Sequence, residues 1–395
     1  MLVTTPWQII IYRKRSKPID PVRILLYLIQ EFRNLIQPAG RIYMSHFLND
    51  RYMNMEVYVP GEQPKDKPYI KLNANETSLP PSKKVLEAIS EKEVKGLGKY
   101  SDPYCVSIRA AIGSVYGLSE DQVFVGNGSD EVLGFICMSF FHHDSKICFP
   151  DITYYFYRVY AKTYGLNMLE IPLREDFTIN IDDYIHTEHH VIIANPNAPT
   201  GYKISTDEIE EILKVKSDRL VIIDEAYVDY GNESCVSLLE KYPNLIVVQT
   251  FSKSRNLAGA RIGFALASKE IIEDLNRIKF TFNPYNLSTL TIAAGTAAIL
   301  DTEYLKHCVD TTIETREYTM DKLKELGFTV LKSHTNFIFV KHPVLYAKDY
   351  YKSLKDEGIL TRYFDEDRVR EYLRITIGTK AEMEVFIKAT AKILN

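Results

Sequence analysis

A series of short apolar runs, recurring between about residues 120 and 266, places the strongest constraint on how this chain folds. The runs are separated by stretches with helical spacing. Each run is continuous rather than alternating, which predicts strands buried on both faces. This pattern is typical of a largely parallel sheet covered by helices, so the predicted fold class is α/β. The runs are Val123–Val125, Ile147–Phe149, Val191–Ile193, Leu220–Ile223, Ile246–Val248 and Ile262–Ala265.

The pattern changes after Pro284. Helical stretches run from Leu287 to about Leu326, where Gly327 ends the second one. Short strands are predicted after that point, with helices between them and a last helix over Lys380–Leu394. This succession predicts a smaller α+β domain. The predicted strands are Thr329–Leu331, Asn336–Val340, Leu360–Tyr363 and Leu373–Ile377. Upstream, Ser205–Glu208 has the sequence of a capping box and predicts a helix start.

Charge, cysteine usage and hydropathy exclude several classes of protein. The net charge of -4 gives no overall indication of nucleic-acid binding. No apolar run reaches the roughly 20 residues that span a bilayer, so we expect no membrane association. The 5 cysteines are scattered without CxxC spacing, which is typical of free thiols in a reducing cytoplasm. The histidine doublets at 142–143 and 189–190 lack the spacing of a metal site, and we expect no metal.

The first 43 residues differ from the rest of the chain, because Lys and Arg outnumber acidic residues there. Asp20–Pro21 could cap an amphipathic helix that runs from Ile24 to Leu35. A transit peptide and a partner-binding helix are both open interpretations of this segment. We favour an upstream extension of unknown role, with Met44 as the natural start.

Polar residues that could take part in binding or catalysis lie where the predicted strands end. In open parallel sheets, ligands bind beyond the carboxyl ends of the strands. Taken singly, each residue has a plainer interpretation: a turn, a helix cap or a solvated charge. Together they supply a lysine, a carboxylate, an asparagine, an arginine and a loop suited to phosphate. That set predicts a site for pyridoxal phosphate (PLP). The residues are Gly128, Ser129, Asp130, Asn195, Asp224, Tyr227, Thr250, Ser252, Lys253 and Arg261.

Several of these segments resemble a known enzyme family. Asn195–Gly201, Asp224–Tyr227 and Thr250–Lys253, with Arg261 at a matching distance, are similar to the motifs of class I/II aminotransferases. Ala198 stands in place of the commoner second Asn of its loop and leaves Asn195 untouched. Other segments resemble the histidinol-phosphate aminotransferase branch, and the resemblance covers roughly residues 44–395. They are Tyr58–Gly61, Lys71–Glu76, Tyr100–Pro103, Leu257–Gly259, Pro284–Ser288 and Leu373–Thr379.

The resemblance implies the type I fold of PLP-dependent transferases. This fold has a large, mostly parallel sheet domain covered by helices and a smaller α+β domain. We expect residues 1–43 to be an extension and residues 44–75 to be an arm that joins the small domain and a dimer interface. Residues 76–285 would form the large PLP-binding domain, and residues 286–395 the small C-terminal domain.

The resemblance also implies a role for each site residue. Lys253 would form the Schiff base with PLP and move a proton, and Asp224 would pair with the pyridinium nitrogen. Asn195 and Tyr227 would hydrogen-bond the phenolic oxygen, and Tyr154 would stack on the ring. The cofactor phosphate would be held by Gly128, Ser129, Asp130, Thr250, Ser252 and Arg261, with Tyr100 reaching it from the neighbouring subunit of a homodimer.

Substrate binding would fall to Arg362 and Arg374, with Tyr58 from the partner chain. Alternation along Leu373–Ile377 places Arg374 and Thr376 on the face opposite the apolar residues. A planar guanidinium suits both a carboxylate and a phosphate. The resemblance therefore implies an enzyme of histidine biosynthesis that interconverts histidinol phosphate plus 2-oxoglutarate and imidazole-acetol phosphate plus glutamate.

Other functions stay open or are disfavoured at this point. An aromatic amino-acid aminotransferase and a threonine-phosphate decarboxylase would use the same fold. A PLP-binding transcription regulator would need a DNA-binding domain, for which a 43-residue extension is too small. A dinucleotide-binding oxidoreductase is disfavoured, because the loop at Gly126 and Gly128 lacks the third glycine of GxGxxG.

Overall fold

The computed structural model describes residues 45–49, 52–53, 55, 61–231 and 233–395. The chain divides into two units, residues 1–56 and residues 57–395. The helices and strands assigned in the described residues all belong to the second unit. The predicted helix from Ile24 to Leu35, the predicted start at Met44 and the predicted substrate residue Tyr58 lie outside the described residues.

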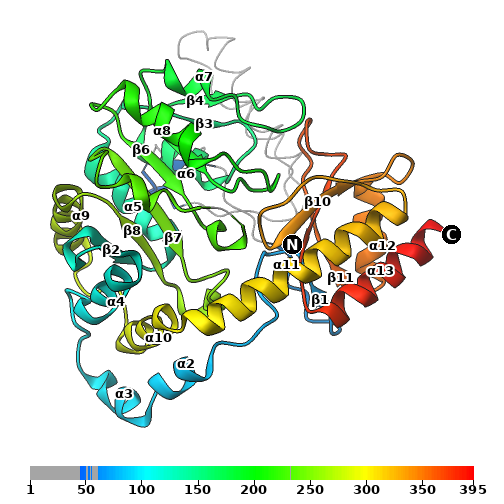
Figure 1. The fold of residues 1–395 in the computed structure, drawn as a ribbon, viewed down its shortest axis with the longest axis horizontal. Helices are drawn as coiled ribbons and strands as arrows, with labels where there is room; N and C mark the ends of the chain where they lie inside the picture. The colour runs from blue at the N-terminus through cyan, green and yellow to red at the C-terminus, as the bar shows by residue number, and fades with distance from the viewer. Residues whose placement is uncertain (1–44, 50–51, 54, 56–60, 232) are drawn as a thin grey trace, which may run out of the picture. The chain divides into compact units, whose positions relative to one another are not determined.

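A mixed sheet of seven strands lies at the centre of the larger part of the second unit (Figure 1), in the order β2-β8-β7-β6-β5-β3-β4. Neighbouring strands are parallel except at β8, which runs antiparallel to both β2 and β7. The prediction of a largely parallel α/β sheet is confirmed. The strands are β2 (Val123–Gly126), β3 (Lys146–Pro150), β4 (Asn167–Ile171), β5 (His190–Ala194), β6 (Val221–Asp224), β7 (Leu245–Thr250) and β8 (Gly263–Leu266).

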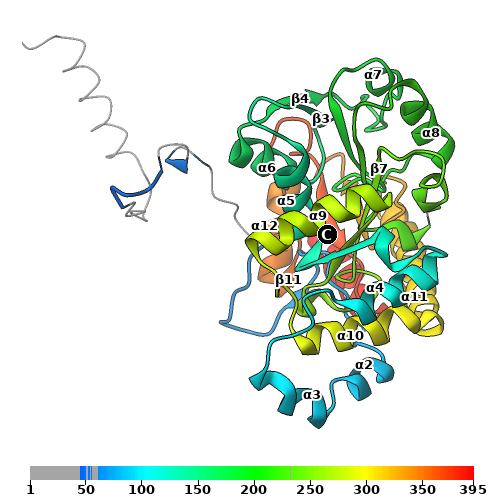
Figure 2. The same ribbon diagram turned by 90° about the vertical axis from the view of Figure 1, so that its left-hand side faces the viewer.

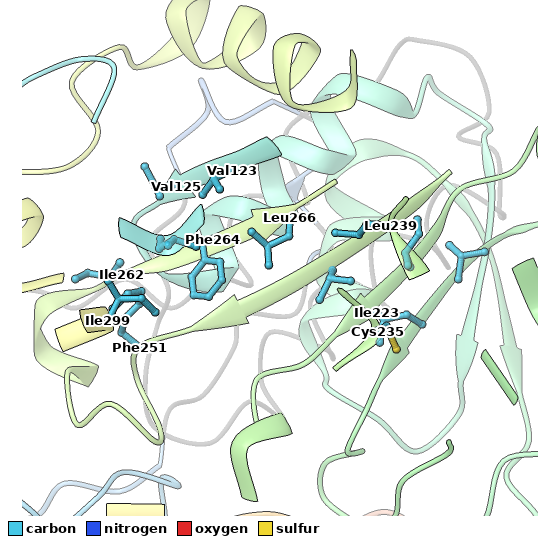
Figure 3. Close-up of a cluster of buried hydrophobic side chains, with 14 of the residues drawn as sticks. Val123, Val125, Ile223, Cys235, Leu239, Phe251, Ile262, Phe264, Leu266 and Ile299 are labelled. Atoms are coloured by element: carbon cyan, nitrogen blue, oxygen red, sulfur yellow. The ribbon is translucent and has the colours of Figure 1, made fainter. Parts of the chain in front are cut away.

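The continuous apolar runs form these strands because both faces of the sheet are covered. Successive side chains of a strand point to opposite faces. Val221 and Ile223 therefore enter one hydrophobic core, and Ile222 enters the other. Figure 3 shows part of the first core, where Val123 and Val125 of β2 lie near Phe264 of β8.

Helices cover both faces of the sheet. The first core includes side chains from α4 (Val106–Tyr116), α8 (Thr206–Val215) and α10 (Thr289–Leu300). Of these, α4 and α10 pack side by side (Figure 2). The second core includes side chains from α5 (Gly128–Phe140), α6 (Phe156–Tyr164) and α9 (Lys269–Phe282). The predicted capping box of Ser205 and Glu208 is present at the start of α8.

The shorter helices lie between these elements. They are α2 (Lys83–Ala88), α3 (Glu91–Lys95) and α7 (Asp182–Ile185), and the 3-10 turns η3 (Gly96–Gly98), η4 (Glu120–Gln122), η5 (Val228–Tyr230), η6 (Cys235–Leu238) and η7 (Ala258–Ala260). None of the helices in the described part of the chain combines the length and the apolar character that a membrane crossing requires.

The sequence pattern missed strand β4. This strand lies at the edge of the sheet and pairs only with β3. Its residues Asn167, Met168 and Leu169 are exposed, so the segment lacks the fully apolar run that marks the central strands. Fewer side chains are buried in a strand at the edge of a sheet than in a central strand. Its sequence therefore need not be a continuous apolar run, and the run is correspondingly hard to detect.

The C-terminal elements, orange to red in Figure 1, form a separate core of their own. The long helix α11 (Thr302–Glu325) ends before Gly327, whose φ of +87° favours glycine, as predicted. A four-stranded sheet follows, in the order β12-β13-β10-β9. Its elements and their helices are β9 (Thr329–Val330), β10 (Phe337–Lys341), α12 (Ala347–Asp356), β12 (Arg362–Tyr363), β13 (Leu373–Thr376) and α13 (Lys380–Leu394).

An upstream segment joins this C-terminal core. Strand β1 (Ile70–Lys71) pairs in parallel with β11 (Ile359–Leu360), and Leu72 is fully buried among the C-terminal apolar side chains. The chain then passes from this core to the residues around Asn75 and on to the large sheet. The division of the chain at residues 75 and 285 stays a prediction.

Candidate active site

The ends of three strands meet where the predicted site lies. Gly263 at the start of β8 is in register with Gly126 at the end of β2 and with Thr250 at the end of β7. This follows because β8 runs antiparallel to both β2 and β7, so its first residue lies at the edge where those two strands end. Arg261 precedes β8 in the sequence and nevertheless reaches the same edge as Asp224, the last residue of β6, and Lys253, which follows β7.

Glycines allow the backbone to close tightly around the start of α5. A Cβ at Gly128, where φ is +82°, would lie 2.5 Å from Nη2 of Arg261. A Cβ at Gly263 would lie 2.2 Å from the backbone N of Ser129. Both positions therefore require glycine for β8 and Arg261 to approach the first turn of the helix. The N–H groups of that turn and the guanidinium together suit an anion such as a phosphate.

Hydroxyl groups complete this anion site. The hydroxyl of Thr250 donates to Oγ of Ser252 over 3.0 Å and accepts from the backbone N–H of Ser252 over 3.2 Å. Arg261 is half-exposed and holds Asp130 at 3.4 Å, and its φ of +52° is unusual for a residue with a side chain. Left-handed backbone at a residue other than glycine is a form of strain that clusters at functional sites.

Asp224 is a buried carboxylate at the end of β6, with 4% of its surface exposed. Its Oδ2 accepts a hydrogen bond from the hydroxyl of Tyr157 over 2.8 Å, and its Oδ1 accepts one from the backbone N–H of Ala226 over 3.2 Å. Burial raises the pKa of Asp224 to about 6, and these two hydrogen bonds oppose the rise. A cation placed against this carboxylate would relieve the cost of its burial.

Lys253 and Tyr227 stand close to this carboxylate. Nζ of Lys253 lies 5.6 Å from the centre of the Tyr227 ring. The hydroxyl of Tyr227 accepts a hydrogen bond from Nδ2 of Asn75 over 2.9 Å. Lys253 thus lies in the turn after β7, next to the ring of Tyr227. A hydrogen bond from Asn75, far away in the sequence, fixes the position of that ring.

Tyr154 forms another part of the wall. Its hydroxyl donates to Oδ1 of Asp130 over 2.7 Å, and its ring stacks against Phe156 at 5.5 Å between centroids. Burial, together with the charge of Asp130, raises the pKa of Tyr154 well above its ordinary value. The phenol therefore stays neutral and presents an aromatic ring at the cavity.

Asn195 lies directly after β5 and is 1% exposed. Its side-chain amide makes two hydrogen bonds with the backbone of Ile204. Nδ2 donates to the carbonyl over 3.1 Å, and Oδ1 accepts from the N–H over 3.0 Å. The amide nitrogen carries two hydrogens, so one of them is left to donate elsewhere. Asn195 holds its own loop in shape, and its contact with a ligand stays a prediction.

These elements enclose a cavity of about 300 Å³. The cavity brings together most of the residues that the sequence predicted, with carboxylate, hydroxyl, ammonium and guanidinium groups on its walls. Its lining residues are Ala74, Glu76, Ser129, Asp130, Tyr154, Ala194, Ala198, Asp224, Ala226, Tyr227, Thr250, Ser252, Lys253, Ala258, Gly259 and Arg261.

Some predicted residues lie outside the wall of this cavity. Tyr100 is 82% exposed and stacks on Tyr285 at 4.6 Å between centroids. Arg362 and Arg374 are register partners on β12 and β13. Nη2 of Arg374 donates to the carbonyl of Asn73 over 3.0 Å, and its guanidinium lies over Phe337 at 5.5 Å. Neither arginine is among the lining residues of the cavity.

Four residues of the site had no predicted role: Asn75, Tyr157, Ala74 and Glu76. Asn75, Ala74 and Glu76 belong to a segment that was singled out for its resemblance, which was the available signal. Tyr157 had none, because a tyrosine inside an amphipathic helix is usually part of the core. Its contact with Asp224 arises from the packing of α6 on the sheet.

The residues present fit PLP. A buried carboxylate suits a protonated ring nitrogen, aromatic residues suit the faces of a planar ring, and a glycine-lined helix start with an arginine suits the phosphate. Lys253 supplies the amine in the same cavity. The fold and this cavity define a PLP-dependent enzyme.

Comparison with known proteins gives the family. The family model described as aminotransferase class I and II matches residues 67–389. The histidinol-phosphate aminotransferase of Brachyspira hyodysenteriae is 49% identical over 353 residues, which cover 89% of this chain and 100% of that protein. That of Clostridium botulinum is 47% identical over 352 residues, covering 89% of this chain and 99% of that protein. The chain belongs to the class I and II aminotransferases, in the histidinol-phosphate aminotransferase family.

Solved structures agree with this assignment of the fold. The histidinol-phosphate aminotransferase of Sinorhizobium meliloti, in complex with pyridoxal-5'-phosphate, has a TM-score of 0.81 at 24% identity and covers 90% of this chain and 99% of that one. That of Clostridium acetobutylicum has a TM-score of 0.76 at 26% identity and covers 82% of this chain and 99% of that one. The predicted fold, family and cofactor are confirmed. The roles of individual residues stay predictions.

Proposed function

We propose that this enzyme transfers an amino group between histidinol phosphate and 2-oxoglutarate, forming imidazole-acetol phosphate and glutamate, reversibly. The observation that carries the proposal is the combination of near-complete coverage at 49% identity with a histidinol-phosphate aminotransferase and a cavity that places Lys253 beside Asp224. The reaction belongs to histidine biosynthesis.

Four side chains of the cavity wall, together with Asn195 beside it, have a part in this proposal. When bound, PLP supplies an electron sink for the bonds at the carbon that carries the amino group. Lys253 would hold the cofactor through its amine and would move a proton at the substrate carbon. Asp224 keeps the ring nitrogen protonated, and its burial strengthens that attraction. Tyr227 and Asn195 hydrogen-bond the phenolic oxygen, while Tyr154 packs on the ring.

The phosphate of the cofactor is assigned to the start of α5. Backbone groups of Gly128, Ser129 and Asp130 would donate to it, together with the hydroxyls of Thr250 and Ser252 and the guanidinium of Arg261. The support is geometric, because Gly128 and Gly263 lack side chains and so let Arg261 and β8 approach the first turn of α5 closely. Asp130 neutralises part of the charge of Arg261 and also orients Tyr154.

Substrate anions are assigned to Arg374 and Arg362, with Tyr58 of the partner chain. Leu373, Ile375 and Ile377 enter the C-terminal core, which leaves Arg374 on the opposite face of β13, as the alternation predicted. The two arginines lie directly opposite each other on the paired strands β12 and β13. An adjacent pair of guanidinium groups can bind a carboxylate in one half-reaction and a phosphate in the other.

The active unit in this proposal is a homodimer with shared sites. Tyr100 would reach the phosphate of the partner's cofactor, and it is exposed rather than turned to the cavity of its own chain. Apolar side chains near it in the sequence are exposed as well, including Leu86 at 63%, Leu97 at 50% and Tyr104 at 58%. Exposed apolar side chains that gather on one segment favour a protein interface.

A cytoplasmic location is part of the same proposal. All 5 cysteines of the sequence lie in the described residues, where they are free and buried. Free thiols are typical of proteins in a reducing compartment.

A transamination assay tests the proposed function. Purified protein loaded with PLP would be given histidinol phosphate, phenylalanine or tyrosine as the amino donor, with 2-oxoglutarate as the acceptor, and in a separate reaction threonine phosphate alone. We expect kcat/KM to be highest for histidinol phosphate. A higher value for the aromatic amino acids would identify an aromatic aminotransferase instead, and release of CO2 from threonine phosphate without amino transfer would identify a decarboxylase.

A further inference from the structure

Asn75 connects the cavity to the C-terminal sheet. It is 2% exposed, and both ends of its side-chain amide have protein partners. Nδ2 donates to the hydroxyl oxygen of Tyr227 over 2.9 Å. Oδ1 accepts from the hydroxyl of Thr376, on β13, over 3.2 Å. A buried amide thus bridges Tyr227, in the loop after β6, and Thr376 of the four-stranded sheet, which lie about 150 and 300 positions away in the sequence.

The hydrogen-bond partners determine which end of the amide faces Tyr227. The hydroxyl of Thr376 accepts from the backbone N–H of Asn75 over 3.0 Å, and its own hydrogen is directed to Oδ1. The nitrogen end therefore points to Tyr227. A tyrosine hydroxyl has one hydrogen and accepts through its oxygen. Because Asn75 donates to that oxygen, the hydrogen of Tyr227 is left to donate into the cavity.

The backbone around Asn75 is arranged to hold this geometry. Its φ is +53°, a left-handed conformation that asparagine adopts more readily than most residues with a side chain. Its carbonyl accepts from Nδ2 of Asn336 over 3.0 Å. Two positions upstream, the carbonyl of Asn73 accepts from Arg374, so the segment is bound to β13 at two points.

We propose that Asn75 is a positioning residue that makes Tyr227 a hydrogen-bond donor toward the phenolic oxygen of bound PLP. Through Thr376 it also ties this donor to the strand that carries Arg374. The inference rests on the proposed function, since it requires PLP to occupy the cavity beside Tyr227. Asn75 itself acts on the cofactor only through the tyrosine.

The test follows the absorbance of PLP in the loaded enzyme without substrate, as a function of pH. Asn75→Asp keeps the shape of the side chain but removes its N–H donor, so Tyr227 would donate to the new carboxylate instead of the cofactor. A hydrogen bond from Tyr227 stabilises the negative charge on the phenolic oxygen and so favours the deprotonated cofactor. Without that hydrogen bond, the bound cofactor would lose its proton only at higher pH. We expect the midpoint of the absorbance change to rise by about 0.5–1 pH unit.

A double-mutant cycle shows whether Asn75 acts through Tyr227. Tyr227→Phe alone gives the full effect of losing the donor. We expect Asn75→Ala to shift the midpoint in the same direction, and the double variant to match Tyr227→Phe, because the second change then has nothing left to remove. A double variant shifted by the sum of the two single changes would contradict the inference.

Asn73→Ala is the matched control in the same segment. Asn73 is also 2% exposed, and its Nδ2 donates to the carbonyl of Glu62 over 2.9 Å, away from Tyr227. We expect this variant to unfold at a lower temperature and to keep the wild-type midpoint. If the wild type binds PLP and the Asn75 variants show the same midpoint of the absorbance change as the wild type, this inference alone is overturned. A wild-type chain that binds no PLP would overturn the proposed function as well.

Discussion

Asp224→Asn separates the energetic cost of a buried carboxylate from its use in the reaction. In the protein without PLP, burial raises the pKa of Asp224 to about 6 from an ordinary value of 3.8. Between these pH values the unfolded chain releases the proton and the folded chain retains it, so the folded state loses stability as pH rises. A difference of about 2 units corresponds to about 3 kcal/mol, lost in full above pH 6.

The substitution keeps the local contacts. The amide oxygen of an asparagine can accept from the backbone N–H of Ala226, as Oδ1 of Asp224 does over 3.2 Å. Its NH2 group can donate to the hydroxyl oxygen of Tyr157, which now lies 2.8 Å from Oδ2. We therefore expect the PLP-free variant to be more stable than the wild type by about 3 kcal/mol at pH 8 and by about half of that at pH 5.

Urea unfolding of the two PLP-free proteins, at pH 5 and pH 8 and at one protein concentration, measures this difference. With PLP bound, the same variant should lose turnover, because a neutral amide no longer holds the ring nitrogen protonated. A charge-assisted hydrogen bond is worth about 1.5–3 kcal/mol, which corresponds to a loss in kcat of roughly 10- to 100-fold. We expect PLP affinity to fall much less than kcat.

Two results would refute this reasoning. The PLP-free variant could be less stable than the wild type, or its gain in stability could be the same at both pH values. Either result would show that the buried charge of Asp224 does not destabilise the folded protein. Near-normal turnover would show that Asp224 only caps the loop at Ala226.

Three further substitutions test the assigned roles. Lys253→Ala should fold and bind PLP without a covalent link, with nearly all turnover lost; a lysine adduct that borohydride still fixes in this variant would disprove the assignment. Tyr100→Phe chains mixed with Lys253→Ala chains should regain activity, because hybrid dimers contain one site without either change; confirmed hybrids without recovery would mean that each site is built from one chain. Arg374→Lys should raise KM for glutamate and for histidinol phosphate together, with PLP affinity unchanged, since the planar fork is lost while Arg261 is intact; an effect on glutamate alone would leave Arg362 as the phosphate ligand.

Much of the large sheet could be predicted from local sequence. A strand that is buried on both faces must be apolar at every position, and the runs at 123–125, 191–193 and 246–248 show this directly. The edge strand β4 lacks that requirement and was missed. Likewise, Gly327 predicted the end of α11, because a left-handed backbone favours glycine whatever the surroundings.

The candidate site was predictable where a residue ends a strand or comes within a few positions after it. Asp224 and Lys253 lie at one edge because parallel strands end together. The same logic does not extend to Arg374 and Arg362. Alternation predicted the face of β13 on which Arg374 lies, but the sequence could not show that its guanidinium lies over Phe337 and bonds to Asn73.

The sequence by itself therefore determined the central strands of the large sheet, the edge of the sheet that holds the site and the chemical groups available there, since burial and backbone conformation act within a few residues. The tertiary structure alone decided which distant groups meet. The antiparallel direction of β8 brings Arg261 to the start of α5, and the packing of α6 places Tyr157 against Asp224. The bridge from Tyr227 through Asn75 to Thr376 joins segments that lie far apart in the chain. No local pattern encodes such contacts, because they depend on how whole strands and helices pack.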